Sequence, residues 1–127
     1  MGSDNATDLG RRAVACPGWQ WMPGMVVLTF DAGHRYASRI NDEDCESSIR
    51  NRGIDPLPDL TDPATLGCLL ALVREAWGDE AMAAWPHPQA GRAKAWRVWR
   101  PGLPVAYGPT EAAALVAALE AAPVGAG

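Results

Sequence analysis

The stretch from Thr61 to Gly78, TDPATLGCLLALVREAWG, constrains the fold most, because its start, its apolar spacing and its end all indicate one helix. Asp62 is a suitable N-cap acceptor, and Pro63 fits the first helical position, where a missing N–H costs nothing. Gly78 can adopt the left-handed conformation that ends a helix. Apolar side chains recur at helical spacing and form one stripe: Leu66, Leu69, Leu70, Val73 and Trp77. The rest of the chain must supply a surface for this stripe.

Two further helices are expected, one near each end of the chain. Residues 4–15 (DNATDLGRRAVA) have the composition and the capping residues of a short helix. Near the other end, Thr110 caps a helix that carries Glu111 in its first turn. The flanking residues are expected to be loose ends: 1–4 and 123–127.

Strand signals lie before and after the central helix. Residues 25–30 are apolar and β-branched, residues 34–40 alternate, and the Asp31-Ala32-Gly33 segment between them is typical of a turn, so a β-hairpin is predicted. After the helix, residues 94–100 (KAWRVWR) alternate cleanly, and residues 103–107 form a last strand that Pro104 confines to an edge or an end.

These elements predict a single α+β domain over all 127 residues, with an antiparallel β-meander or hairpins and two or three amphipathic helices packed on it. A short apolar run at residues 81–85 is the candidate for a further strand. Residues 41–60 are acidic at first and spaced by prolines later, which favours an exposed loop. Cation binding by its acidic residues is a minor alternative, because the ligand order of a calcium loop is missing: Asp42, Glu43, Asp44 and Glu46.

Charge and cysteine content exclude several classes of function. A net charge of −4 argues against a dedicated binder of double-stranded nucleic acid, whose affinity comes mainly from neutralised phosphates. The three cysteines have no C-x-x-C spacing, so neither a disulfide framework nor a zinc site is indicated, and no cofactor is expected: Cys16, Cys45 and Cys68. No apolar run approaches the length of a membrane span, so we expect a cytoplasmic protein without membrane contact.

Trp19 and Trp21 are the first candidate ligand-binding residues. They lie in a segment, CPGWQWMPGM, whose prolines and glycines favour a shaped loop. Indole rings in a loop can stack on a flat ligand such as a nucleobase. The alternative, which we favour, is that both rings are part of the core, because rings two residues apart on an extended segment face the same way.

The second candidate site is the basic and aromatic stretch at residues 92–100. Its cations and rings suit an anionic nucleotide, with phosphate on the guanidinium fork and base on the ring: Arg92, Lys94, Trp96, Arg97, Trp99 and Arg100. Arg35 and Arg39, on one face of the predicted hairpin, complete such a site if the hairpins adjoin. The competing interpretation is a strand whose arginines are solvated or paired with the acidic loop that follows the hairpin.

Catalytic motifs are weak. His34 has only Asp31 as a nearby carboxylate, and His87 has no partner in the sequence pattern. Glycine-rich phosphate-binding loops of the P-loop or dinucleotide type are missing. The sequence therefore favours a protein without catalytic activity.

Three segments resemble a family of small uncharacterised proteins encoded by tailed phages and prophages of GC-rich bacteria: PGWQWMPGM, LPDLTDPATLGCLLALVREAWG and GPTEAAALVAALEAA. The helix–hairpin–helix part is also similar to phage domains described as an α-β-α sandwich. The resemblance covers most of the chain outside residues 41–60 and supplies no catalytic residues. It implies an accessory protein in the cytoplasm of an infected bacterial cell, where such proteins often antagonise host defence.

Together, these observations predict a non-catalytic phage accessory protein that counteracts host immunity by sequestering a small anionic nucleotide signal, which makes it a sponge. Because sites of this type often form between subunits, a homo-oligomer is expected. The alternative is a protein-binding inhibitor of a host defence effector, of the anti-CRISPR type, whose acidic residues 42–46 mimic nucleic-acid phosphates. A signal-degrading enzyme and a structural role in the virion are further alternatives.

Overall fold

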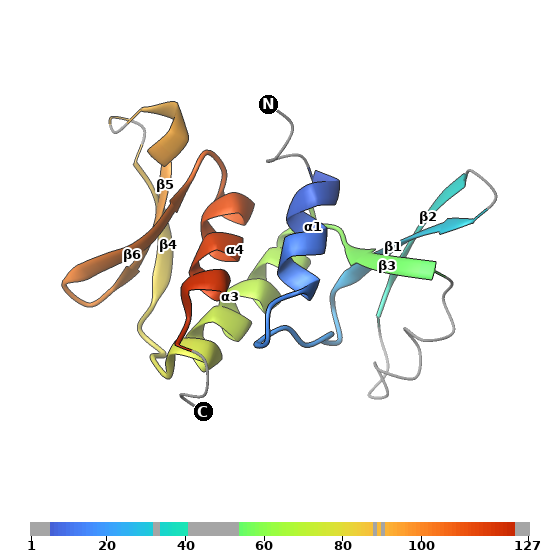
Figure 1. The fold of residues 1–127 in the computed structure, drawn as a ribbon, viewed down its shortest axis with the longest axis horizontal. Coiled ribbons are helices and arrows are strands. Elements are labelled where there is room, and N and C mark those ends of the chain that lie inside the picture. Colours follow the sequence, from blue (N-terminus) through green and yellow to red (C-terminus); the bar gives the residue numbers. More distant parts are fainter. Residues whose placement is uncertain (1–5, 32–33, 41–53, 88, 90, 124–127) are drawn as a thin grey trace.

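The computed structural model describes residues 6–31, 34–40, 54–87, 89 and 91–123. These residues form an α+β fold in which two three-stranded antiparallel sheets lie at opposite ends and the helices lie between them (Figure 1). The predicted fold class, antiparallel hairpins with helices packed on them, is confirmed. The division of the strands into two separate sheets is a finding that the sequence did not predict.

The central helix α3 spans Pro63–Trp77 and has the predicted ends. Asp62 caps it by accepting a hydrogen bond from the backbone N–H of Thr65 at 2.9 Å, which satisfies one of the donors left free at a helix start. Gly78 ends it with φ at 66°, a conformation that glycine adopts without steric cost. Local sequence signals therefore set both boundaries of this helix.

Helix α1 spans Ala6–Val14 and helix α4 spans Glu111–Ala121, both close to their predicted positions. Helix α4 is the most buried element, because α1, α3 and the second sheet all pack against it. Its buried side chains include small and branched residues: Ala112, Ala113, Ala114, Leu115, Val116, Ala118 and Leu119. The indole Nε1 of Trp77 donates a hydrogen bond to the carbonyl of Ala118 at 2.9 Å, which ties α3 to α4.

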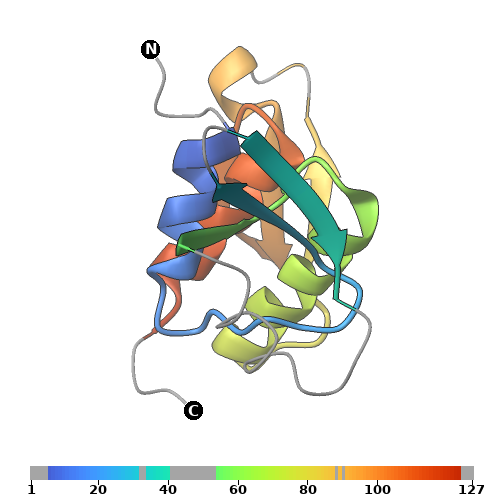
Figure 2. The same ribbon diagram turned by 90° about the vertical axis from the view of Figure 1, so that its right-hand side faces the viewer.

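The first sheet has the strand order β2-β1-β3, with β1 at Val26–Asp31, β2 at His34–Arg39 and β3 at Ile54–Pro58. The register confirms the predicted hairpin, since β1 and β2 pair along their whole length. The two turn residues, 32 and 33, lie outside the described residues. Figure 2 shows this sheet from the end of the molecule, in front of the helices.

Strand β3 corrects the prediction of an exposed loop at residues 41–60. Residues 54–58 of this stretch form β3 and pair with β1 instead. Leu57 and Leu60 are buried, with only 4% and 3% of their surface exposed. Proline is tolerated here because β3 is an edge strand, where a missing N–H costs little. Residues 41–53 lie outside the described residues, and with them the acidic candidates for cation binding or phosphate mimicry.

The second sheet has the order β4-β5-β6, with β4 at Ala83–Pro86, β5 at Trp96–Arg100 and β6 at Leu103–Gly108. The short 3-10 helix η2, Arg92–Lys94, precedes β5, so the predicted strand at residues 94–100 begins later than expected. Helices α3 and α4 lie on one side of this sheet (Figure 1).

The side of the second sheet that meets the helices is part of the core. Val98 is fully buried and Ala106 is 6% exposed, and these two residues pair across β5 and β6. Within the described ranges, no helix is long and apolar enough to cross a membrane.

Candidate functional site

The side of the second sheet that faces away from the helices carries a row of large side chains. Trp85 on β4 and Tyr107 on β6 both pair with Arg97 on the central strand β5, and directly paired residues point to the same face. Trp85 is 61% exposed and Tyr107 is 38% exposed. Since Val98 next to Arg97 is fully buried, alternation along β5 places this row on the outer face.

Cations and rings alternate across this outer face. The guanidinium carbon of Arg97 lies 5.3 Å from the ring centroid of Tyr107 and 5.9 Å from that of Trp99. The ammonium nitrogen of Lys94 lies 5.0 Å from the centroid of the same Tyr107 ring. These distances are within cation–π range. We call this set the cationic-aromatic face: Trp85, Lys94, Arg97, Trp99 and Tyr107.

Arg97 carries a positive charge that no carboxylate neutralises. Among the described residues it has no ion pair, and its Nε is shielded from solvent without a hydrogen-bond partner. Lys94 likewise has no ion pair within the part of the chain that the structure describes. An uncompensated guanidinium held between rings is arranged to accept an oxyanion.

Three other arginines differ, because each is paired with an acidic side chain. Arg12 binds Glu120 at 2.6 Å, Arg39 binds Asp62 at 3.1 Å, and Arg100 binds Asp79 at 3.3 Å: these are the ion pairs of the described residues. Their charge is therefore used within the fold. Two of the predicted site arginines, Arg39 and Arg100, are therefore paired with a carboxylate and are not part of the cationic-aromatic face.

The structure separates the predicted site residues. Arg97 and Trp99 lie together on the cationic-aromatic face, whereas Arg100 lies over the ring of Trp77 at 5.4 Å. Arg39 belongs to the first sheet, and its guanidinium also donates to the carbonyl of Gly24 at 2.7 Å. Arg35 pairs with Phe30 in that same sheet. The two hairpins belong to separate sheets at opposite ends of the fold, so the condition under which Arg35 and Arg39 were expected to complete the site is not met.

Trp19 and Trp21 pack against the core as partly buried side chains, which is the interpretation that the sequence favoured. Their rings contact each other edge to face, with centroids 5.2 Å apart and planes at 89°. This geometry is typical of packed aromatic pairs. Trp19 and Trp21 thus pack against the core, whereas Arg97 lies on the outer face of the second sheet.

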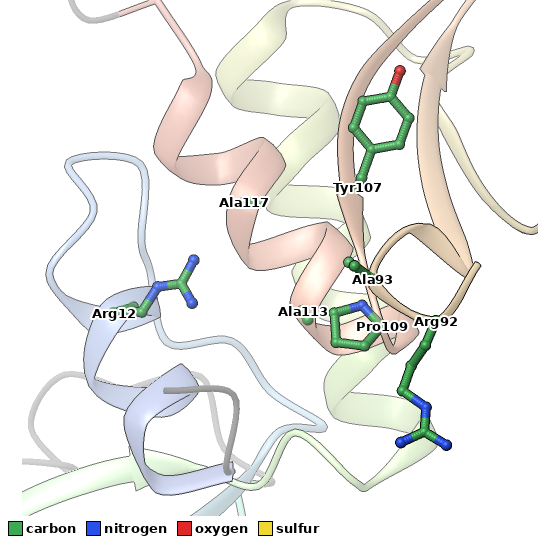
Figure 3. A pocket seen from close by; sticks show the side chains of 8 residues that line it. Arg12, Arg92, Ala93, Tyr107, Pro109, Ala113 and Ala117 are labelled. Atoms are coloured by element: carbon green, nitrogen blue, oxygen red, sulfur yellow. The ribbon is translucent and has the colours of Figure 1, made fainter. Parts of the chain in front are cut away.

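Arg92 lines a groove beside the cationic-aromatic face. The groove has a volume of about 410 Å³ and runs over α4 between α1 and η2. Figure 3 shows Arg12 extending from α1 toward α4, with Tyr107 and Arg92 on the other side of that helix. The floor is made of small side chains, Ala113 and Ala117. Arg92 is exposed and has no ion pair among the described residues.

Sequence reasoning missed Trp85 and Tyr107. The alternating pattern of β5 shows which of its own side chains share a face, but it cannot show which residues of β4 and β6 lie opposite. In the sequence, Trp85 is only the last residue of a short apolar run, and Tyr107 is only the last residue of the final predicted strand. Their relation to Arg97 depends on strand register, which is a tertiary property.

The two histidines are the remaining candidates for chemistry in the described part of the chain. His34 is exposed on β2 and lies 6.4 Å from the ring of Tyr36, and His87 lies in the second half of the chain after β4. No group of three or more His, Cys, Asp or Glu is placed to hold a metal ion among the described residues. Cys16 is buried, and burial raises the pKa of its thiol, which disfavours the reactive thiolate.

Comparisons with protein-family models, with curated proteins and with solved structures find no match to this chain. The resemblance to phage and prophage proteins therefore stays a prediction.

Proposed function

We propose that this protein is a non-catalytic binder of a small anionic nucleotide and acts by sequestering it. The observation that carries the proposal is the guanidinium of Arg97, which lies between the rings of Tyr107 and Trp99 without a carboxylate partner in the described residues. As a phage accessory protein, it would act on a host immune signal inside the infected cell.

The cationic-aromatic face supplies the two chemistries that a nucleotide needs. Arg97 offers a planar fork for phosphate oxygens, and Lys94 adds a second cation at the same ring. Trp85, at 61% exposure, presents an indole surface on which a base can stack. Stacking of this kind contributes about 1–3 kcal/mol per base.

The cations of this face lack acidic partners although the chain as a whole is acidic. The protein carries −4 in total, yet Lys94 and Arg97 have no acidic partner among the described side chains. In a protein with more acids than bases, cations that are left unpaired and gathered around rings indicate selection for an anion. Sequestration needs only binding, so it requires no nucleophile or base at this face.

The test is uptake of nucleotides by the purified protein. The protein is incubated with a panel of linear and cyclic nucleotides, washed, and heated to release what it bound, and the released compound is identified. Recovery of an intact nucleotide supports a sponge, whereas recovery of an altered nucleotide contradicts a non-catalytic role.

The matched variants are Arg97→Gln and Arg11→Gln. Both remove one positive charge, but Arg11 is exposed on α1, away from the second sheet. Uptake should be lost in the first variant and retained in the second. Equal uptake by both variants would mean that Arg97 does not hold the ligand.

A protein partner is the second candidate, and the exposed aromatic rings are the observation that favours it. Tryptophan, tyrosine and arginine are the residues that most often dominate the energy of protein interfaces, and all three occur in the row of Trp85, Arg97 and Tyr107. The same variants distinguish this reading. If the protein takes up no nucleotide but still inhibits host immunity, and Arg97→Gln loses that inhibition, the protein is an inhibitor that binds a host defence protein.

A further inference from the structure

The groove over α4 is a second place where arginines gather. The described residues that line it include two arginines and no carboxylate: Arg12, Arg92, Ala93, Tyr107, Gly108, Pro109, Ala113 and Ala117. Its volume of about 410 Å³ falls within the usual range for small-molecule sites, roughly 300–1,000 Å³. The groove is therefore large enough for a ligand of the size of a mononucleotide.

Arg12, which lines the groove, already binds an oxyanion at its edge, and that oxyanion is the side chain of Glu120. Its Nε donates to one carboxylate oxygen at 3.0 Å and its Nη2 donates to the other at 2.6 Å, so the guanidinium fork is fully engaged. Both side chains remain accessible, at 37% and 40% exposure. A carboxylate held at the surface in this way can be exchanged for another oxyanion, because an exposed ion pair contributes little free energy.

The small floor leaves room for the body of such a ligand. Ala113 and Ala117 face the groove from α4, and neither side chain extends far from the helix backbone. Tyr107 and Pro109 lie beyond them, on the side opposite Arg12 (Figure 3). A flat group that extends from the Arg12 fork across these alanines would reach the wall formed by Tyr107, Gly108 and Pro109.

We infer that this groove is a second binding site, for a small molecule that carries a phosphate or carboxylate group, and that Glu120 occupies the Arg12 fork until the ligand displaces it. Arg92 lines the opposite wall. Glu120 thus acts as a built-in competitor that sets the affinity of the site. This site borders the cationic-aromatic face at Tyr107 but uses a different guanidinium, Arg12, so its binding can be tested without Arg97.

The experiment is an NMR titration with AMP in the Arg97→Gln background, which removes the contribution of the cationic-aromatic face. Adenosine serves as the uncharged comparison, and inorganic phosphate shows whether the anion alone suffices. We expect binding of AMP, weaker binding of phosphate and no binding of adenosine. Arg12→Gln should weaken AMP binding at least about tenfold, because it removes a charge-assisted bidentate contact.

Glu120→Gln is the decisive variant, because it should change the affinity for AMP in the direction opposite to Arg12→Gln. This variant breaks the same ion pair as Arg12→Gln, but it removes the competing carboxylate and keeps the guanidinium, so AMP should bind roughly two- to fivefold more tightly. A purely structural role of the ion pair predicts that both variants change binding in the same direction. That result, or an unchanged affinity in both variants, or failure of AMP to bind at all, overturns the inference. Arg11→Gln, on the same helix but outside the groove lining, should leave the affinity unchanged.

Discussion

The hydroxyl of Thr65 accepts a hydrogen bond at 2.9 Å from the backbone N–H of Val26, and so joins the first turn of α3 to the first residue of β1. The same hydroxyl donates to Asp62 at 2.9 Å. Thr65 is fully buried and Val26 is 9% exposed, so water cannot replace this acceptor. One buried side chain therefore connects the helix cap to the sheet.

Thr65→Val keeps the shape of this side chain but removes the hydroxyl, and we expect it to lower the free energy of unfolding by about 1–3 kcal/mol. The reason is that the Val26 N–H would remain buried without a partner. Urea denaturation followed by circular dichroism measures the change. Thr65→Ser keeps the hydroxyl and should lose less stability. Equal losses in both variants would attribute the effect to packing of the methyl group alone.

Asp62 makes stability depend on pH in the acidic range. Hydrogen bonds from Arg39, followed by that from the Thr65 backbone, lower the pKa of the Asp62 carboxyl from the ordinary value of 3.8 to about 2. Because the folded-state pKa is lowered, the stabilisation is complete above about pH 4 and disappears as the pH falls toward 2.

Asp62→Asn isolates this charge, since asparagine is also a good N-cap residue. Urea denaturation of both proteins at several pH values should show a constant stability difference between pH 7 and 5, with the wild type more stable. The difference should shrink below pH 4. Subtracting the variant removes the contribution of Glu120, whose pKa is also lowered by its bonds to Arg12. A difference that does not vary with pH would exclude the ionised carboxylate as the cause.

Gly108 permits the close approach of β6 to α4. A Cβ atom at this position would lie 2.5 Å from the backbone nitrogen of Ala114 and 2.8 Å from the carbonyl carbon of Ala113. Backbone atoms cannot move aside as a flexible side chain can, so Gly108→Ala should destabilise the protein by about 1–3 kcal/mol. Thermal denaturation measures this loss.

Gly67→Ala is the matched control, because the same methyl group is added where there is space. Gly67 lies inside α3, and a Cβ there meets no atom within 4 Å. Alanine has the higher helix propensity, so this variant should gain about 0.5–1 kcal/mol. Opposite signs for the two substitutions are the expected result. A loss of stability in both would show that the close contact at Gly108 is not what matters.

The sequence predicted elements with local causes and missed those with distant ones. Helix α3 was predictable because its cap, stripe and stop all lie within residues 61–78. Strand β3 was not, since its sequence IDPLP has two prolines and becomes a strand only by pairing at the edge of β1. The site divides in the same way: Arg97 and Trp99 share one strand, whereas Arg39 and Arg100 are paired with acids more than twenty positions away.

Trp85→Ala tests the cationic-aromatic face with the least risk to the fold. The indole is 61% exposed on an edge strand, so its removal should change the melting temperature little. If a base stacks on it, affinity for a nucleotide found in the uptake assay should fall roughly 5- to 150-fold, the equivalent of about 1–3 kcal/mol. Tyr36→Ala removes an aromatic ring of 54% exposure from the other sheet and should leave affinity unchanged.

The salt dependence of the same affinity identifies which part of the ligand each residue holds. A phosphate on Arg97 and Lys94 should bind more weakly as ionic strength rises, because salt screens exposed charges. Trp85→Ala should keep this dependence, since a neutral ring does not change it, whereas Lys94→Gln should reduce it. If Trp85→Ala and Lys94→Gln changed the salt dependence alike, the rings and cations of this face would not divide base and phosphate between them.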